Sequence, residues 1–175
     1  MGLVAATIGA AAGLGASYIT ARQQKQLEVH RATAERAAER EREVRLAVGE
    51  FAAVLSRAIQ VISWFTWQAA HRVTVVSPAW VDAYDSEMRE QLPLVMAALS
   101  RVAALSPAAF QTFNPLVVEM FDIDASVGRA GSAIDEAPDV ARAGIAEFDH
   151  TTDALFERFQ DALASWAGDD PGPAN

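Results

Sequence analysis

The sequence predicts an all-α fold, and three observations support this prediction. No Pro lies between Met1 and Ser77, and Gly49 is the only Gly after Gly15 in that stretch. Apolar residues recur from residue 44 onward at alternating steps of four and three, the spacing of a helix in a bundle. The β-prone run 73–76 is too short to build a sheet. We expect an Ala/Gly-rich membrane-type helix that continues into a stalk helix, followed by an antiparallel bundle of three to four helices.

Residues 1–21 carry no charged side chain and are expected to span a membrane. At 1.5 Å per residue this segment matches a hydrocarbon core of about 30 Å. Tyr18, Arg22 and Lys25 stand where residues of the membrane interface are expected. Because the bases follow the segment, the positive-inside rule predicts a single-pass protein of the cell membrane with its remainder in the cytoplasm. The alternative is an Ala/Gly helix buried inside a soluble assembly.

A four-residue repeat of small side chains lies inside this segment, at Ala5, Gly9, Gly13 and Ser17. Small residues on one stripe let two membrane helices approach closely, so that packing and weak Cα–H···O contacts hold them together. The stripe predicts association with a second copy or with another membrane helix.

Charge divides the remainder of the chain into a stalk and an acidic body. Residues 22–45 hold seven bases and five acids, whereas residues 46–175 hold seven bases and eighteen acids. The resulting net charges of +2 and −11 predict membrane lipid and a protein docked on the acidic bundle as partners, and argue against nucleic acid. We expect a charged helical stalk over 22–43, a helical bundle over 44–168 and a disordered acidic tail over 169–175.

Two kinds of pattern predict the bundle helices: lines of apolar residues, here called seams, and helix start signals. The first seam consists of Val44, Val48, Phe51, Leu55, Ala58, Ile62, Phe65 and Ala69. Ser77 and Ser106, each followed by Pro, predict new helices. We expect the first of these to run from Pro78 to about Leu105, kinked or broken at Pro93. We expect the second to be interrupted at 114–115 and to end before Gly128, with 124–138 connecting it to the last helix.

The last helix is predicted as one continuous element that ends at Gly168. Its seam consists of Ala141, Ile145, Phe148, Thr152, Leu155, Phe159, Ala162 and Trp166. These steps of four and three indicate a helix that packs along the bundle.

Residues that could carry chemistry are few. The chain has no Cys and a single Lys, and it lacks the G-x-S-x-G, phosphate-loop and H-E-x-x-H motifs. Glu147 and His150 form one Glu-x-x-His pair, whereas a di-metal bundle uses two such pairs and two further carboxylates. Candidate carboxylates on other helices, at no diagnostic spacing, are Glu87, Glu90, Glu119 and Asp122. We therefore expect no metal, no cofactor and no enzymatic activity.

The aromatic residues allow two interpretations. Trp64, Trp67, Trp80 and Trp166 could line a ligand pocket between helices, although core packing explains them more simply. Trp64, Phe65 and Trp67 fall within four positions and cannot all face one side, so at least one is expected to be exposed to a partner. His71 is expected to cap helix carbonyls or to meet solvent.

The run ITARQQ, which ends the uncharged segment, and the stalk run HRATAERAAEREREVRLAV resemble short, functionally uncharacterised single-span proteins of high-GC bacteria and their phages. The resemblance covers about the first sixty residues and implies an architecture but no functional residue. The sequence as a whole favours a membrane-anchored bundle that acts through protein–protein contacts and self-association, as a scaffold, regulator or assembly component. The alternatives are a ligand- or metal-binding bundle and a membrane-active phage or toxin-like oligomer.

Overall fold

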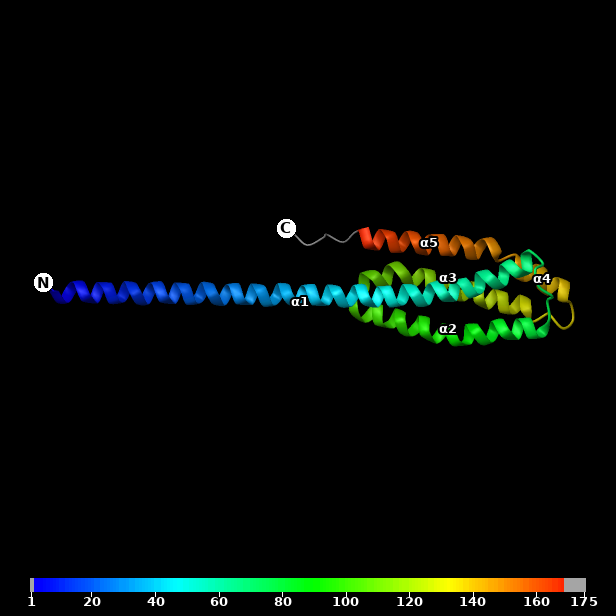
Figure 1. Ribbon diagram of the computed structural model, residues 1–175, viewed down its shortest axis with the longest axis horizontal. Helices are drawn as coiled ribbons and strands as arrows, with labels where there is room; N and C mark the ends of the chain where they lie inside the picture. The colour runs from blue at the N-terminus through cyan, green and yellow to red at the C-terminus, as the bar shows by residue number, and fades with distance from the viewer. Residues whose placement is uncertain (1, 169–175) are drawn as a thin grey trace. The chain divides into compact units, whose positions relative to one another are not determined.

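The computed structural model describes the backbone of residues 2–168 and the side chains of residues 24–168. Within these residues it contains helices and no strand, which confirms the all-α fold (Figure 1). The helices are α1 (Gly2–Ala70), α2 (Pro78–Leu105), α3 (Pro107–Gly131), α4 (Pro138–Ala146) and α5 (Asp149–Gly168). The chain divides into two compact units, residues 1–43 and 44–175. The predicted acidic tail, 169–175, lies outside the described residues.

The first unit is helical from Gly2 onward. Side chains from Gln24 to Glu43 are exposed, apart from a half-buried Ala32. The Thr33 hydroxyl donates a hydrogen bond back to the carbonyl of Val29, as is usual for Thr on a helix. With so little burial, this stretch is helical because its Ala, Gln, Glu and Arg residues are good helix formers.

The second unit is an antiparallel bundle, in which the end of α1, α2, α3 and α5 run in alternating directions (Figure 1). The α3 backbone lies close to those of α2, α4 and α5. Side chains join α1 to the others: the rings of Phe51 and Phe113 on α3 are 5.4 Å apart. Ser63 donates to Asp153 of α5 over 3.3 Å. The core therefore has side chains from all four long helices.

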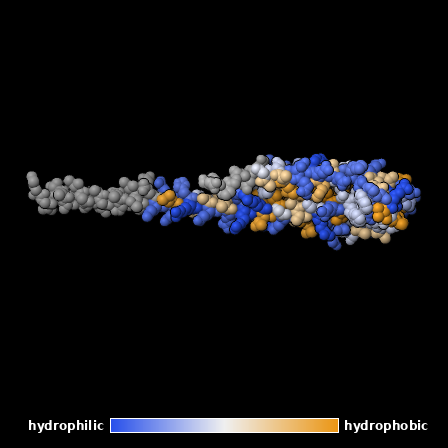
Figure 2. All heavy atoms as spheres, turned by 45° about the horizontal axis from the view of Figure 1, so that its top comes forward, coloured by the Kyte–Doolittle hydropathy of each residue, from blue (hydrophilic) through white to orange (hydrophobic). Residues whose placement is uncertain are grey.

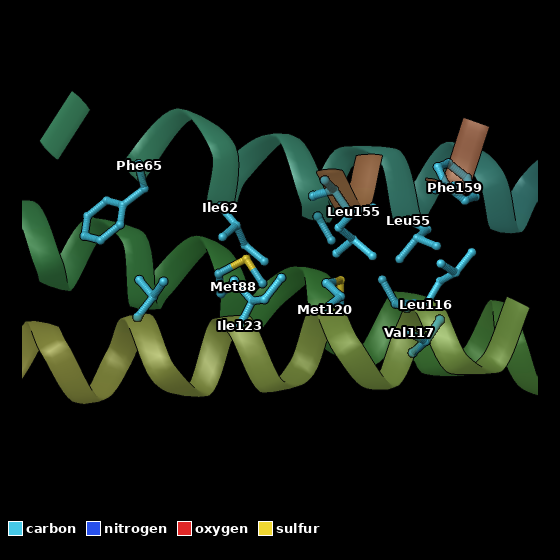
Figure 3. Close-up of a cluster of buried hydrophobic side chains, with 14 of the residues drawn as sticks. Leu55, Ile62, Phe65, Met88, Leu116, Val117, Met120, Ile123, Leu155 and Phe159 are labelled. Carbon is cyan, nitrogen blue, oxygen red and sulfur yellow. The ribbon is translucent and has the colours of Figure 1, made fainter. Parts of the chain in front are cut away.

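The α1 seam predicted from the sequence faces this core. Seven of its eight residues are buried, and Val44, at its start, is half-buried. In Figure 3, Leu55 and Ile62 point from α1 toward Met120 and Ile123 of α3. Burying a large aliphatic or aromatic side chain contributes about 1.5–3 kcal/mol, so this seam is a main source of stability.

The predicted helix starts at Ser77 and Ser106 are confirmed. The Ser77 hydroxyl accepts the Trp80 N–H at 3.4 Å, and the Ser106 hydroxyl accepts the Ala109 N–H at 3.2 Å. Each Ser thus satisfies a backbone donor that the first helical turn leaves unpaired. The helix between them, α2, is continuous through Pro93, so the break considered there does not occur.

The predicted interruption of the next helix at 114–115 and its end before Gly128 are both wrong, because α3 continues to Gly131. Pro115 is exposed, and Gln111, whose carbonyl loses its helical partner, is exposed as well. Water can satisfy that carbonyl, while burial of the stripe from Leu116 to Val127 keeps the helix intact. Much of the predicted connection 124–138 is therefore helix.

The prediction of a single last helix is also wrong. The chain turns at 147–148 and forms α4 and α5, although the predicted seam still faces the core through Ile145 and Leu155. At the turn, the Phe148 N–H donates to the carbonyl of Ile145, three residues back, at 3.2 Å. Asp149 and the following β-branched residues are weak helix formers, which favours a break there. Within the described residues, α5 runs to Gly168.

Phe113 on α3 is expected to be the most sensitive single core position. Its ring is fully buried and lies 6.5 Å from the rings of both Phe159 and Trp166, in addition to its contact with Phe51. Phe113→Ala should lower the free energy of unfolding by about 3–5 kcal/mol, because it leaves a cavity between α1, α3 and α5.

Urea unfolding followed by circular dichroism would measure this loss. Val118→Ala, on the exposed side of the same helix, is the control and should change stability by less than about 0.5 kcal/mol. Equal losses for the two variants would contradict this account of the core.

Candidate interaction surface on α1

Two tryptophans on α1 are exposed to solvent. Phe65 is buried, whereas 59% of Trp64 and 36% of Trp67 remain exposed, so the expectation that the crowded aromatic residues cannot all face inward is confirmed. The Trp64 and Trp67 rings stack with centroids 5.1 Å apart. Trp67 also stacks on His71 at 4.8 Å. The exposed side of α1 thus carries a short ladder of aromatic rings.

The end of α1 supports this ladder. The N–H of His71 donates to the carbonyl of Trp67, and His71 Nδ1 lies 3.0 Å from the same oxygen. His71 therefore caps a carbonyl and meets solvent, as expected from the sequence. Arg72 adopts a positive φ of 53°, and the Val73 N–H reaches back to the carbonyl of Gln68. This pattern of bonds closes a helix C-terminus and usually has Gly at the positive-φ position.

A groove of about 360 Å³ lies beside the ladder, between α1 and α2. Trp64, Trp80 and the amides of Gln60 and Gln68 line it, together with Arg57 and Glu87, which form an ion pair at 3.2 Å. Phe65 lies behind, with its ring stacked on Trp80 at 3.9 Å and on Tyr84 at 4.1 Å. The volume falls at the lower end of the range for small-molecule pockets.

Tyr84 and Asp124 form a polar link between α2 and α3. The Tyr84 hydroxyl donates to Asp124 Oδ1 at 2.6 Å. Burial, chiefly, raises the pKa of the Tyr84 hydroxyl, and the acceptor Asp124 raises it further. Burial also raises the pKa of the Asp124 carboxyl, aided by the nearby Asp85, while the bond from Tyr84 opposes that shift. The pair thus keeps a partly buried carboxylate hydrogen-bonded and joins two helices.

Charge is distributed unevenly over the second unit. Residues 46–70 of α1 contain one acid, Glu50, and one base, Arg57, whereas residues 71–168 contain fifteen acids and six bases. Both of these charged residues pair with α2, Glu50 with Arg101 and Arg57 with Glu87. On the face of the second unit that Figure 2 shows, hydrophobic side chains form separate patches among hydrophilic ones. We call the exposed positions Leu46, Gly49, Ala53, Gln60, Trp64 and Trp67 the outward face of α1.

Most of the predicted association and interface residues cannot be placed further. The side chains of Ala5, Gly9, Gly13, Ser17, Tyr18 and Arg22 lie outside the described part of the chain, although their backbone belongs to α1. Lys25, the last of the predicted interface residues, is exposed on α1. The sequence pointed to the exposed aromatic residues, and it offered a pocket lined by tryptophans as one interpretation, of which Trp64 and Trp80 do line the groove. It contained no signal for the Tyr84–Asp124 link.

The weak metal candidates are not brought together. Glu147 lies in the turn between α4 and α5, and His150 lies in the first turn of α5. Contrary to the prediction, the two residues therefore do not share one helix. Of the additional carboxylates, Glu87 pairs with Arg57 and Glu119 with Arg158. Among the residues that the structure describes, no three His, Asp or Glu side chains form a possible metal site.

One helix segment, Gln24–Ala70, is long and apolar enough to cross a membrane by length and composition. Ten of the twenty residues from 24 to 43 are charged, so the apolar part of this segment lies within 44–70. That same part supplies Phe51, Leu55 and Ile62 to the bundle core. Its apolar character is therefore used in packing. The side chains of residues 1–21 lie outside the described part of the chain.

The raised pKa of Asp124 makes stability depend on pH. The folded protein holds this proton more tightly than the unfolded chain, whose carboxyl titrates near 3.8. The free energy of unfolding therefore falls as pH rises from below 3.8 to above the raised pKa of Asp124 in the folded protein. Asp124→Asn keeps an oxygen for the Tyr84 hydroxyl and carries no charge. The variant should gain stability over the parent as pH rises from 3 to 7, by up to about 1 kcal/mol because the carboxyl is only partly buried.

Thermal unfolding over this pH range would measure the gain. Asp122→Asn, at an exposed position on the same helix, is the matched control and should follow the parent. A gain for Asp124→Asn that is constant with pH would count against the role of its ionisation.

Comparison of the chain with protein families, with curated proteins and with solved structures finds no match.

Proposed function

We propose that this protein is a non-enzymatic, membrane-anchored helical bundle that acts through protein–protein contacts and self-association, as a scaffold, regulator or assembly component. The observation that carries the proposal is the stacked Trp64–Trp67 pair, which is exposed, whereas the other aromatic rings in the described part of the bundle are buried or half-buried. Exposed aromatic residues on a folded helix are typical of surfaces that bind other proteins.

The anchor is residues 1–21. They carry no charge, they belong to α1, and seven bases follow between residues 22 and 45. A helix of this length fits a hydrocarbon core of about 30 Å, and bases after it favour a cytoplasmic bundle. Tyr18, Arg22 and Lys25 would contact the headgroup region of the cell membrane.

The acidic helices α2–α5 offer a second surface. Together these helices hold twelve acids and five bases, which create a negative field that would attract a basic protein partner and repel nucleic acid. The exposed ion pairs on this surface each contribute less than about 1 kcal/mol, so a basic partner can displace them at little cost.

A second candidate function is ligand binding in the groove between α1 and α2. Its aromatic rings and its two Gln amides suit a small planar molecule with hydrogen-bonding groups. The groove is open to solvent at Trp64, so a bound aromatic ligand would quench the fluorescence of that residue.

Loss of the uncharged character of residues 1–21 should release the protein from membranes. Each Lys in the middle of a membrane helix costs about 2.5–3.5 kcal/mol, so Ile8→Lys with Leu14→Lys should abolish insertion. After a carbonate wash, the parent chain is expected in the membrane pellet and the double variant in the supernatant.

Leu27→Lys with Val29→Lys provides the matched control, because both residues are exposed beyond the segment. This variant should stay in the pellet. Release of the parent chain by carbonate would refute the anchor.

The small-residue stripe should hold two membrane helices together. Gly9→Ile with Gly13→Ile places branched side chains where the backbones must approach, so association in a membrane reporter assay should fall to background. Ala11→Ile with Gly15→Ile has the same spacing on another side of the helix and should leave association unchanged. An unaffected Gly9/Gly13 variant would exclude the stripe as the contact.

A further inference from the structure

The groove between α1 and α2 combines aromatic side chains with a carboxylate. Trp64, Trp80 and Tyr84 line it. Glu87 lines it as well, and its Oε1 accepts a hydrogen bond from Arg57 at 3.2 Å. Aromatic rings attract cations because their faces carry a partial negative charge, and a neighbouring carboxylate adds to this attraction. The groove therefore favours a positively charged organic group.

Three polar groups of the groove have acceptor oxygens to offer. Within the described side chains, the bond from Arg57 is the one hydrogen bond that the Glu87 carboxylate makes, so its Oε2 can accept another. Gln60 and Gln68 also line the groove, and neither side-chain amide is hydrogen-bonded to another residue between 24 and 168. Each amide oxygen is an acceptor. A cation that also donates several hydrogen bonds would match this set.

Arg57 shows which kind of cation the groove accepts. Its guanidinium already reaches from α1 to Glu87 of α2, through a single nitrogen, Nη2. The Arg57 side chain is 65% exposed, and an exposed pair of this kind contributes little to stability, so a second guanidinium can displace it at small cost. A guanidinium is planar, stacks on aromatic faces and donates hydrogen bonds in a fork, whereas the ammonium of lysine is a compact point charge.

The charge around the groove indicates where such a guanidinium comes from. Glu90 follows Glu87 by three residues, so it lies one turn along the same side of α2, and it is exposed. Residues 71–168 hold fifteen acids and six bases. A chain segment with several bases is attracted by this field more strongly than a small molecule with one charge, and an anion is repelled. The field thus favours an arginine within a basic protein segment.

We propose that the groove between α1 and α2 binds the guanidinium of an arginine from a basic segment of the protein partner, stacked on Trp64 and paired with Glu87 in place of Arg57. The proposal rests on the proposed docking of a protein on the acidic bundle, and it identifies the side chain that the partner contributes. Trp64 is 59% exposed, so its ring is accessible to an incoming side chain. The volume of about 360 Å³ suits one small group rather than a folded element.

Peptides that differ only in their cation test this assignment. The full-length protein in a neutral detergent is titrated, at low ionic strength, with a blocked peptide of four Gly-Arg repeats, and binding is followed by calorimetry. Four Gly-Lys repeats carry the same charge, and four Gly-citrulline repeats keep the planar shape without charge. The arginine peptide should bind about tenfold more tightly than the lysine peptide, because only the guanidinium can stack and form forked hydrogen bonds. The citrulline peptide should bind more weakly than both.

Glu87→Gln tests the carboxylate of the groove. This variant should bind the arginine and lysine peptides equally, because the partner of the guanidinium is lost. The matched control is Glu119→Gln on α3, which removes the same charge from another exposed pair, Glu119 with Arg158. It should weaken both peptides alike and keep the tenfold preference. Both variants should unfold at the temperature of the parent, since exposed ion pairs contribute little to stability.

Two further variants test displacement and stacking. Arg57→Gln removes the internal competitor and should bind the arginine peptide about threefold more tightly than Arg158→Gln, which removes the same charge away from the groove. Trp64→Leu should weaken binding of the arginine peptide about threefold, because the stacking surface is lost. An Arg57→Gln chain no tighter than Arg158→Gln, or a Trp64→Leu chain as tight as the parent, would overturn the proposal.

The peptide pattern separates this proposal from the docking on which it rests. Equal binding of the arginine and lysine peptides by the parent would overturn the guanidinium site while leaving docking on the acidic bundle intact. A preference for arginine that survives Glu87→Gln would place the site elsewhere and overturn it too. Binding of the citrulline peptide as tight as that of the arginine peptide would assign the groove to a neutral planar ligand instead. Binding of neither cationic peptide would refute the acidic docking surface together with the site.

Discussion

Burial of the α1 seam is the constraint on which the rest of the bundle depends. Phe51, Leu55, Ile62 and Phe65 fill the space between α2, α3 and α5, and each is buried. Because a helix has 3.6 residues per turn, fixing these side chains inward also fixes which side chains point outward. The exposure of Trp64 and Trp67 is thus a consequence of the same register that builds the core. Moving either ring inward would require Phe65 to leave its position against Trp80 and Tyr84.

Electrostatics reinforces this division of α1. The helix has almost no charge after residue 45, so it can be buried deeply on one side with no desolvation cost for ionised groups. Its two charges pair with α2 at the edge of the buried side. Most acidic residues of the second unit lie outside α1. The low number of charged residues in 46–70 helps α1 to pack. It also leaves few charged side chains on the outer side of α1 to oppose association.

The sequence predicted those parts of the fold that local patterns determine. The α1 seam and the two Ser caps depend on spacing and on side chains near one helix terminus, and each was predicted correctly. The errors at Pro115 and at 147–148 arose where tertiary packing competes with local preference. A Pro on the solvent side of α3 costs one hydrogen bond that water replaces, whereas the buried stripe after it favours the helix. At Phe148, the seam spacing is also compatible with a turn, which the pattern of apolar residues cannot reveal.

The candidate surface was predictable only in outline. Crowding of three aromatic residues within four positions implies that at least one must be exposed. Which of them is exposed depends on which side of α1 the other helices cover. The groove beside Trp64 and the Tyr84–Asp124 link join residues 16 to 40 positions apart, and no local pattern encodes such distances.

Exposed aromatic surface carries a risk of nonspecific association, and the arrangement of α1 limits that risk. The two Trp rings stack on each other and on His71, so part of their apolar area is already covered. The face is a narrow line with the ion pairs to α2 on one side and the Ser63–Asp153 hydrogen bond on the other, and such a line fits another helix better than a flat or irregular surface. A contact that small forms only where a partner is held nearby in the correct orientation. If residues 1–21 anchor the chain as proposed, a shared membrane would provide that condition.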